Sequence, residues 1–327
     1  MRCPAARLKR SALSRIPRSD GVGTLSSPKI AEGNIAFGEV GHVRTNGSAL
    51  IRATELAQLV AEGHQPVILD VRWSLAGADR VAFELGHIPG AVFCDLDQDL
   101  SDHERSAEEA GRHPLPSAEK FTASMQALGV SSDSLVVVYD ERDSISAARA
   151  WWCLTYFGHA NVRVLDGGFS SWVNEGHAVT TQVNEVVTSG APFIAVTGHM
   201  PTVTIDEVAS GEGIVLVDVR AAERFRGDFE PVDPVPGHIP GAINSPTLDL
   251  VEADGRFLGV DALLARFDAA GVLGDSDLPV VAYCGSGVTA AHTVLALHLV
   301  GKSAALFPGS YSQWCRDLDR PVARGGV

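Results

Sequence analysis

The chain has 327 residues, of which 45% are hydrophobic and 20% charged, a composition that suits a globular protein with two domains of ordinary size. Its formal net charge of −14 argues against nucleic acid as a partner, because phosphate binding requires a basic face. No apolar run approaches the roughly 18 residues of a membrane-spanning helix, so no membrane partner is expected.

The five cysteines are an odd number and show no CxxC spacing. This disfavours both a disulfide framework and a zinc site, so we expect no metal and a reducing, cytoplasmic location. No nucleotide-binding loop of the GxGxxG or GxxxxGK[ST] type follows a predicted strand, and no cofactor is expected.

Residues 1–47 are expected to form a basic, disordered tail outside the fold. Six basic residues precede the first acidic one, Asp20. The same arginine-rich, acid-poor composition is typical of an organellar transit peptide, and that alternative stays open.

From residue 48 the predicted elements come twice in the same order. In the first half these are a short helix at 50–62, a strand at 66–72, the motif GHIPGA at 86–91, a strand, loop and helix at 134–158, and LDGGFSSW ending at Trp172. In the second half they are a strand ending at Arg220, GHIPGA at 237–242, a strand leading to Cys284, and PGSYSQW ending at Trp314. Shared landmarks in one order indicate a duplicated domain.

The alternation of short apolar strands with helical segments predicts an α/β fold, in which each copy is a mostly parallel sheet covered by helices. We expect one domain over residues 48–173, a linker over 174–201 that lacks helical periodicity, and a second domain over 202–324. His87 and His238 lie in the GHIPGA motif of both copies, so a structural role is favoured for them.

The stretch PVVAYCGSGVTAA, residues 279–291, predicts a strand, a loop and a helix with one apolar face. Cys284 therefore lies at a strand-to-helix turn, where glycines allow several amide N–H groups to point at one spot and the helix adds its positive end. Such a loop favours an anion, here the cysteine thiolate. The alternative is a buried cysteine that acts as a small hydrophobic residue. The first half has Asp140 at the matching position, so thiol chemistry belongs to the second half.

The two GHIPGA motifs, LDGGFSSW and CGSGVTA together resemble the tandem rhodanese-type sulfurtransferases, over residues 48–324. The CGSGVT loop is similar to that of the 3-mercaptopyruvate sulfurtransferases. The thiosulfate enzymes usually carry basic residues directly after the cysteine, where this chain has Gly285 and Ser286.

The resemblance implies two rhodanese-like domains, of which the first is non-catalytic. It implies sulfur transfer from 3-mercaptopyruvate through a Cys284 persulfide to a thiol or cyanide, with a thioredoxin-like protein as one acceptor. It also implies that Ser286 acts with His113 of the HPLP motif and with Asp97 of the FCDLD stretch. The alternatives without a catalytic role are that Ser286 is a small turn residue, His113 an exposed histidine and Asp97 a surface charge.

For the donor, the resemblance implies that Arg224 of the segment RFRG binds a carboxylate, with the loop residues Gly285, Gly287, Val288 and Thr289 around it. A second arginine, often found after the following Glu-Pro, is absent because Val232 stands there, and Arg226 is the candidate to compensate. A bidentate guanidinium is well suited to a carboxylate.

The sequence also bears on three other functions. Thiosulfate as donor is disfavoured by the lack of basic residues next to Cys284. A phosphatase needs an arginine six residues after the cysteine, where this chain has Ala290. A non-catalytic binding module fits the first half with its Asp140, but the intact Cys284 loop speaks against it for the whole chain.

Overall fold

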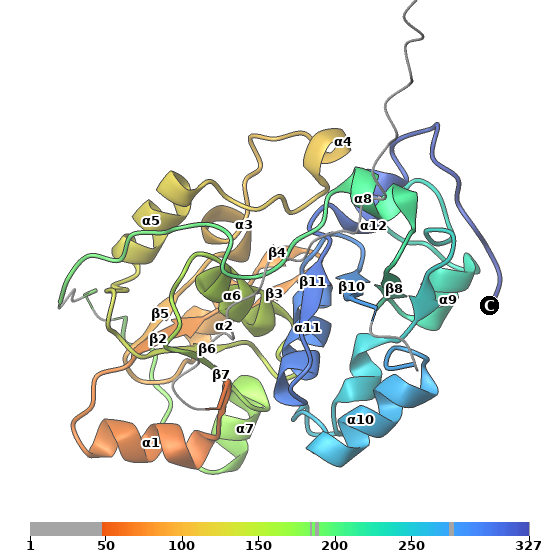
Figure 1. Ribbon diagram of the computed structural model, residues 1–327. Helices are drawn as coiled ribbons and strands as arrows, with labels where there is room; N and C mark the ends of the chain where they lie inside the picture. Colours follow the sequence, from red (N-terminus) through yellow and green to blue (C-terminus); the bar gives the residue numbers. More distant parts are fainter. Residues whose placement is uncertain (1–47, 184, 187–189, 275–277, 327) are drawn as a thin grey trace, which may run out of the picture. The chain divides into compact units, whose positions relative to one another are not determined.

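The computed structural model describes residues 48–183, 185–186, 190–274 and 278–326 (Figure 1). The predicted basic tail, residues 1–47, lies outside the described residues. Two parallel sheets form the framework, one in each half of the chain. No helix in the described ranges is both long and apolar enough to cross a membrane.

The first sheet has the strand order β1-β7-β6-β2-β5, and all neighbours are parallel. Its strands are β1 (Leu50–Ile51), β2 (Val67–Asp70), β5 (Ala91–Phe93), β6 (Val136–Tyr139) and β7 (Val162–Leu165). A small antiparallel hairpin, β3 (Trp73–Ser74) and β4 (Gly77–Ala78), follows β2. The second sheet has the order β11-β10-β8-β9 and consists of β8 (Val215–Asp218), β9 (Ile243–Asn244), β10 (Val280–Tyr283) and β11 (Ala304–Leu306).

Helices surround both sheets. Those of the first half are α1 (Ala53–Ala61), α2 (Arg80–Leu85), α3 (Leu96–Asp99), α4 (Ala107–Ala110), α5 (Ala118–Ala127), α6 (Ile145–Tyr156) and α7 (Gly168–Asn174). Those of the second half are α8 (Ile205–Ser210), α9 (Ala222–Arg226), the 3₁₀ helix η1 (Thr247–Leu250), α10 (Val260–Ala269), α11 (Thr289–Leu299) and α12 (Ser310–Trp314). The predicted α/β fold with two mostly parallel, helix-covered sheets is confirmed.

Both faces of the central strands are buried. Because successive side chains point in opposite directions, alternate residues of one strand enter different cores. In β10, Val280 and Ala282 face a core that is continuous across the two halves, whereas Val281 and Tyr283 face a core formed within the second half. In β6, Val136 and Val138 belong to the shared core. The halves are therefore joined by apolar packing.

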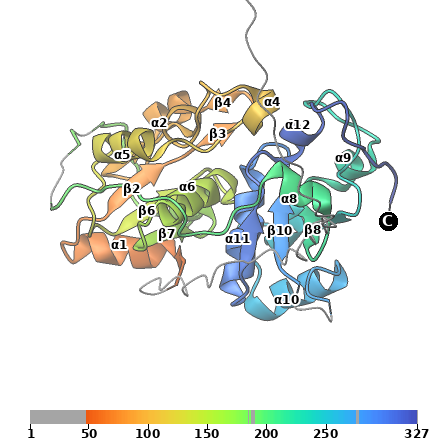
Figure 2. The same cartoon turned by 45° about the horizontal axis from the view of Figure 1, so that its top comes forward.

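Helices α6 and α11 form the centre of this shared core. They pack against each other from opposite halves, and both views show them side by side (Figures 1 and 2). The predicted one-sided apolar face of α11 is wrong, since the helix is buried on all sides from Ala290 to Leu297. The reason is that it has sheet strands on one side and α6 on the other. The helix predicted at 50–62 also differs, because Leu50 and Ile51 pair with β7 and the helix begins at Ala53.

Duplicated sequence motifs form duplicated contacts. In the first half, Arg72 forms an ion pair of 2.7 Å with Asp70 and donates to the carbonyl oxygen of Gly86 at 2.7 Å. Arg220 does the same in the second half, with Asp218 at 2.6 Å and Gly237 at 2.7 Å. Each pair ties the end of a central strand to the GHIPGA turn.

The two GHIPGA histidines also have matching surroundings. His87 stacks on Phe83 with ring centroids 3.9 Å apart, and its Nδ1 lies 2.7 Å from the Phe83 carbonyl oxygen. His238 repeats this on Phe225 at 3.7 Å and 2.8 Å. This supports the structural role predicted for both.

Candidate active site

The loop after β10 places Cys284 at the carboxyl end of a central strand. Its side chain is buried, and the backbone N–H of Gly287 donates to its Sγ at 3.1 Å. Its own N–H donates to Ser310 Oγ at 3.2 Å. Gly287 has φ +82°, and a Cβ there would lie 2.4 Å from the Pro308 carbonyl oxygen. Only glycine therefore allows the turn that aims this N–H at the sulfur.

The corresponding loop of the first half holds an anion in the same place. Asp140 follows β6, and its carboxylate accepts hydrogen bonds from the backbone N–H groups of Ser144, Ser146 and Ala147 at 3.0, 3.0 and 3.2 Å. Burial raises the pKa of Asp140, and these N–H groups act in the opposite direction. A strand-loop-helix turn of this kind thus gathers donors around one negative charge.

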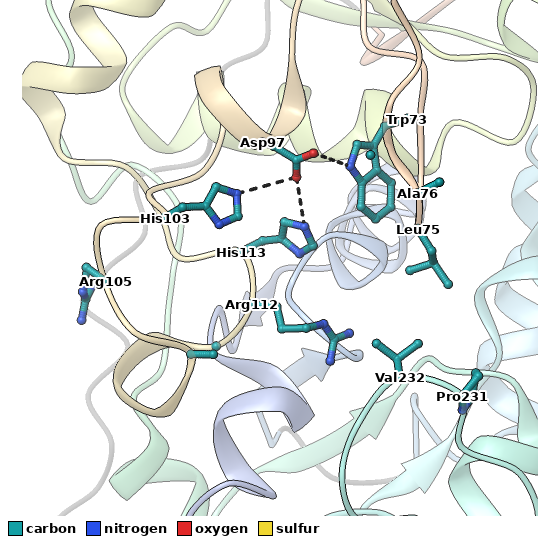
Figure 3. A pocket seen from close by; sticks show the side chains of 13 residues that line it. Trp73, Leu75, Ala76, Asp97, His103, Arg105, Arg112, His113, Pro231 and Val232 are labelled. Carbon is teal, nitrogen blue, oxygen red and sulfur yellow. Dashed lines mark hydrogen bonds and ion pairs between the residues drawn. The ribbon is translucent and has the colours of Figure 1, made fainter.

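Three side chains from the two halves form a chain of contacts next to Cys284. Ser286 Oγ lies 2.7 Å from His113 Nδ1, and His113 Nε2 lies 3.3 Å from Asp97 Oδ1. The indole N–H of Trp73 donates to Asp97 Oδ2 at 3.1 Å (Figure 3). The structure therefore brings together Ser286, His113 and Asp97, which lie far apart in the sequence.

The charges in this chain follow from burial and pairing. Burial lowers the pKa of His113, an effect that Asp97 partly opposes, while the hydrogen bond from His113 lowers the pKa of Asp97. At neutral pH the imidazole is neutral and the carboxylate is ionised. In this state His113 donates a hydrogen bond from Nε2 to Asp97, and its Nδ1 accepts a hydrogen bond from the Ser286 hydroxyl.

A fully buried arginine of α6 connects the His113 segment to the cysteine loop. Arg149 donates to the carbonyl oxygen of His113 at 3.1 Å, to that of Leu100 at 3.1 Å and to that of Gly287 at 3.2 Å. One side chain of the first half thus holds the histidine segment and the cysteine loop in fixed positions relative to each other.

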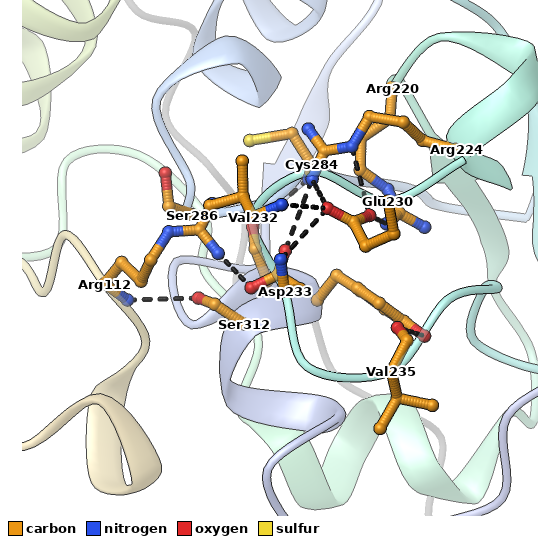
Figure 4. A network of polar contacts seen from close by, with 12 residues as sticks. Arg112, Arg220, Arg224, Glu230, Val232, Asp233, Val235, Cys284, Ser286 and Ser312 are labelled. Atoms are coloured by element: carbon orange, nitrogen blue, oxygen red, sulfur yellow. Dashed lines mark hydrogen bonds and ion pairs between the residues drawn. The ribbon is translucent and has the colours of Figure 1, made fainter. Parts of the chain in front are cut away.

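The two arginines predicted to bind the donor differ in position. Arg224 of α9 is paired with Glu230 at 2.7 Å and with Asp233 at 3.3 Å, next to the cysteine loop (Figure 4). Arg226 is half-exposed and pairs with Asp228 at 2.7 Å. It is not brought to the site, because it lies two residues further along a short helix and thus on another face.

Arg112, which no motif of the sequence marks, also belongs to this cluster. It belongs to the first half, and its guanidinium is paired with Asp233. Its backbone N–H donates to Ser312 Oγ at 3.0 Å. Position 112 precedes the HPLP motif directly, but a contact with a residue so distant in the sequence leaves no signal in a single chain.

Two clefts meet around the hairpin β3–β4. One, of about 820 Å³, is lined among others by Gly285, Thr289 and Arg224. The other, of about 760 Å³, is lined among others by Asp97, His113 and Arg112. Trp73 and Leu75 line both clefts.

The side chain of Val288 is buried in the shared core, so only its backbone faces the loop. In the described ranges, no group of three His, Cys, Asp or Glu residues is arranged to hold a metal ion.

Comparison with known proteins identifies the family. The model of the rhodanese-like domain matches residues 52–175 and 204–317. A Mycobacterium tuberculosis protein assigned as a thiosulfate sulfurtransferase, SseB, is 45% identical over 86% of this chain and 99% of its own length. The 3-mercaptopyruvate sulfurtransferase of Escherichia coli K12 is 38% identical over 78% of this chain and 91% of its own length.

Solved structures agree with this. The crystal structure of SseA from Escherichia coli, a 3-mercaptopyruvate sulfotransferase, superimposes with a TM-score of 0.69 and 33% identity, covering 81% of this chain and 99% of that one. Tum1 from Saccharomyces cerevisiae gives a TM-score of 0.74 and 26% identity, with 85% and 98% covered. The predicted fold and the predicted enzyme class, a sulfurtransferase, are confirmed. The chain belongs to the rhodanese family and carries two rhodanese-like domains in tandem.

Proposed function

We propose that this sulfurtransferase takes its sulfur from 3-mercaptopyruvate, with Cys284 as the carrier. The observation that supports this donor is the contact between Ser286 and His113 at 2.7 Å, with Asp97 behind the imidazole. Release of pyruvate leaves negative charge on carbon, which requires a proton donor. Thiosulfate releases sulfite, which needs no proton on carbon, so the relay has a use only with a carbon-bound sulfur.

In the first step the Cys284 thiolate attacks the thiol sulfur of mercaptopyruvate. The new S–S bond forms as the C–S bond breaks, and the electron pair of the C–S bond passes to carbon as the enolate of pyruvate. The Ser286 hydroxyl delivers a proton to this carbon, and Asp97 holds the imidazole tautomer of His113. The proton that the donor thiol loses as the persulfide ionises passes to His113 Nδ1 and from there to Ser286. The products are pyruvate and an ionised Cys284 persulfide.

In the second step an acceptor thiolate or cyanide attacks the outer sulfur of the persulfide. The S–S bond breaks, its electron pair returns to Cys284 as the thiolate, and the acceptor leaves as a persulfide or as thiocyanate. The Gly287 N–H, which donates to Sγ at 3.1 Å, stabilises the sulfur anion in both states. A thioredoxin-like protein is the acceptor we propose in the cell, and the cytoplasm is the location we propose.

The proposed division of labour follows the predicted boundaries. Residues 202–324 form the catalytic half with the nucleophile and Arg224, which binds the donor carboxylate. Residues 48–173 form the half without a nucleophile, which supplies His113 and Asp97, and residues 174–201 form the linker.

Thiosulfate stays as the second candidate donor, because two guanidinium groups, those of Arg112 and Arg224, pair with Asp233 beside the cysteine loop. The similarity to the Mycobacterium tuberculosis protein assigned as a thiosulfate sulfurtransferase also favours it.

The test is sulfur transfer to cyanide from either donor, measured for the wild type, Ser286→Ala and Ser170→Ala. Ser170 is the matched control, since it also lines a cleft and its hydroxyl has no contact with His113. We expect Ser286→Ala to lower kcat/KM for mercaptopyruvate by on the order of 10²-fold, the usual share of a proton-transfer group, and to leave thiosulfate unaffected.

A wild-type preference for thiosulfate that Ser286→Ala leaves unchanged would reject mercaptopyruvate and the relay together. Alkylation of Cys284 tests its role as the carrier, because it must abolish transfer from both donors. Transfer that survives alkylation would reject Cys284 as the carrier.

A further inference from the structure

The hairpin β3–β4 gives Trp73 a fixed backbone position beside the relay. Trp73 opens the hairpin directly after Arg72, and the N–H of Asp79 closes it by donating to the Arg72 carbonyl oxygen at 2.9 Å. In the second half, Ala221 follows the matching Arg220 and caps helix α9 directly. The hairpin is therefore a feature of the first half that the duplication does not repeat.

The side chain of Trp73 contacts two members of the relay. Its indole N–H donates to Asp97 Oδ2 at 3.1 Å (Figure 3). Its ring meets the imidazole of His113 edge-on, with ring centroids 5.3 Å apart and an angle of 84° between the planes. Within the described residues, no other group donates a hydrogen bond to Asp97 Oδ2. Trp73 thus determines where this carboxylate oxygen lies.

Two histidines compete for the other oxygen of Asp97. His113 Nε2 lies 3.3 Å from Oδ1, and His103 Nε2 lies 3.7 Å from the same atom. The carboxylate is 30% exposed and stands on the short helix α3, so packing alone does not prevent its rotation. Rotation toward the half-exposed His103 would take Oδ1 away from His113. A hydrogen bond on Oδ2 opposes this rotation, because it is directional.

We propose that Trp73 is a positioning residue of the relay, whose hydrogen bond to Oδ2 keeps Oδ1 of Asp97 on His113 instead of His103. This rests on the proposed function, in which Asp97 holds the imidazole tautomer. The hydrogen bond from His113 lowers the pKa of Asp97, and the one from Trp73 acts in the same direction, so both keep the carboxylate ionised. The hairpin is then needed for proton transfer and not for the attack by the thiolate.

The direct test observes His113 by NMR of histidine-labelled protein, with its signal assigned from its loss in His113→Gln. Trp73→Phe removes the N–H donor and keeps an aromatic ring against the imidazole. Burial lowers the pKa of His113 and Asp97 opposes this, so His113 should titrate at lower pH in the variant, where Asp97 has turned away. The variant leaves unchanged the other charged and titratable groups that face His113, which are His103, Arg112 and Arg149.

Sulfur transfer supplies the second readout. Trp73→Phe should lower kcat for mercaptopyruvate by about 10-fold to 100-fold, as for the loss of a hydrogen bond to a charged group, and should change KM by less than about threefold. Thiosulfate turnover should stay within about threefold of the wild type, since its leaving group needs no proton on carbon. The acidic limb of kcat/KM for mercaptopyruvate should move to lower pH together with the His113 titration.

A second substitution separates orientation from a general loss of packing. Adding His103→Leu to Trp73→Phe removes the competing partner of Asp97, so it should raise kcat at least about threefold and return the His113 titration toward higher pH. His103→Leu alone should change kcat by less than about fivefold.

Trp172→Phe is the matched control. It also deletes one indole hydrogen bond of the first half, the one to the Ala178 carbonyl oxygen at 2.8 Å, which lies outside the relay. It should leave the turnover of both donors and the His113 titration unchanged.

An unchanged His113 titration in Trp73→Phe overturns the proposal, whichever donor the enzyme prefers, and so does a titration that His103→Leu fails to return. Equal losses of mercaptopyruvate and thiosulfate turnover, or an equal loss in Trp172→Phe, also overturn it, because they indicate damage outside the relay. A lowered titration with unchanged mercaptopyruvate turnover would support the positioning of Asp97 by Trp73 but reject the proposed use of the relay.

Discussion

The substitution Asp97→Asn tests the relay through the number of acceptors at one position. The Asp97 carboxylate accepts from His113 Nε2 at 3.3 Å and, on its other oxygen, from Trp73 Nε1 at 3.1 Å. Asparagine has nearly the same shape but only one acceptor oxygen. If that oxygen stays with Trp73, the amide NH₂ faces His113 Nε2 and forces it to accept. The proton then moves to Nδ1, where His113 meets the Ser286 hydroxyl as a donor instead of an acceptor.

We therefore expect Asp97→Asn to lower kcat/KM for mercaptopyruvate by on the order of 10²-fold to 10⁴-fold, the range for a misdirected acid–base group. Thiosulfate turnover should stay within about threefold of the wild type, because its leaving group needs no proton on carbon. Pyruvate formation measures the first reaction, and sulfite formation measures the second.

The pH dependence gives a second readout. The relay needs neutral His113, and burial lowers the pKa of His113 below its ordinary value of 6.5, so kcat/KM should rise with pH along a limb that lies below pH 6.5. Asp97 raises the pKa of His113. Its replacement by a neutral residue should move the limb to still lower pH.

His103→Gln is the control, since His103 also approaches Asp97 Oδ1, at 3.7 Å, but is half-exposed. Such a pair contributes little, so the loss should be below about fivefold. The reasoning is refuted if Asp97→Asn keeps mercaptopyruvate turnover within about fivefold of the wild type, or if it moves the acidic limb upward.

Two further substitutions test the support of the cysteine loop. Gly287→Ala should abolish most sulfur transfer and lower the free energy of unfolding by at least about 2 kcal/mol, because it combines strain at positive φ with a clash against Pro308. The control Gly301→Ala, at φ +74° with nothing within 4 Å, should lower it by only about 1 kcal/mol. Equal losses in the two variants, measured by urea denaturation, would contradict this. Arg149→Met should lower the free energy of unfolding by about 2–4 kcal/mol, since three buried carbonyl oxygens lose their donor, and an unchanged denaturation midpoint would contradict this.

The features that the sequence predicts best are those encoded in short motifs. The Cys284 loop is a strand, three small residues and a helix in succession, so its ability to hold an anion follows from local chemistry alone. The contact of Ser286 with His113 is a distant one, and only the resemblance to a known family indicated it. The two-residue strand β1 is too short to show a period, and the helix pattern next to it masks the strand.

Three other features could not be predicted from the local sequence. Arg226 is close to Arg224 in the sequence and was the natural second cation, but the turn of α9 directs it to Asp228. Arg112 reaches Asp233 across the interface instead, and nothing in the residues around position 112 encodes that contact. The full burial of α11 is also invisible in its own sequence, because its outer face is covered by α6.

The interface also explains why the half without a nucleophile remains part of the enzyme. Its own loop is filled by Asp140, whose carboxylate uses the backbone donors that a sulfur anion would need. On the proposed mechanism this half instead supplies His113 and Asp97 for proton transfer, and Arg149 holds the histidine segment against Gly287. An isolated second half would keep the thiol and the loop N–H groups, but it would have no histidine to return a proton to Ser286. On the proposed mechanism, proton transfer therefore depends on the packing of α6 against α11, and any change that separates these helices should affect mercaptopyruvate turnover more than thiosulfate turnover.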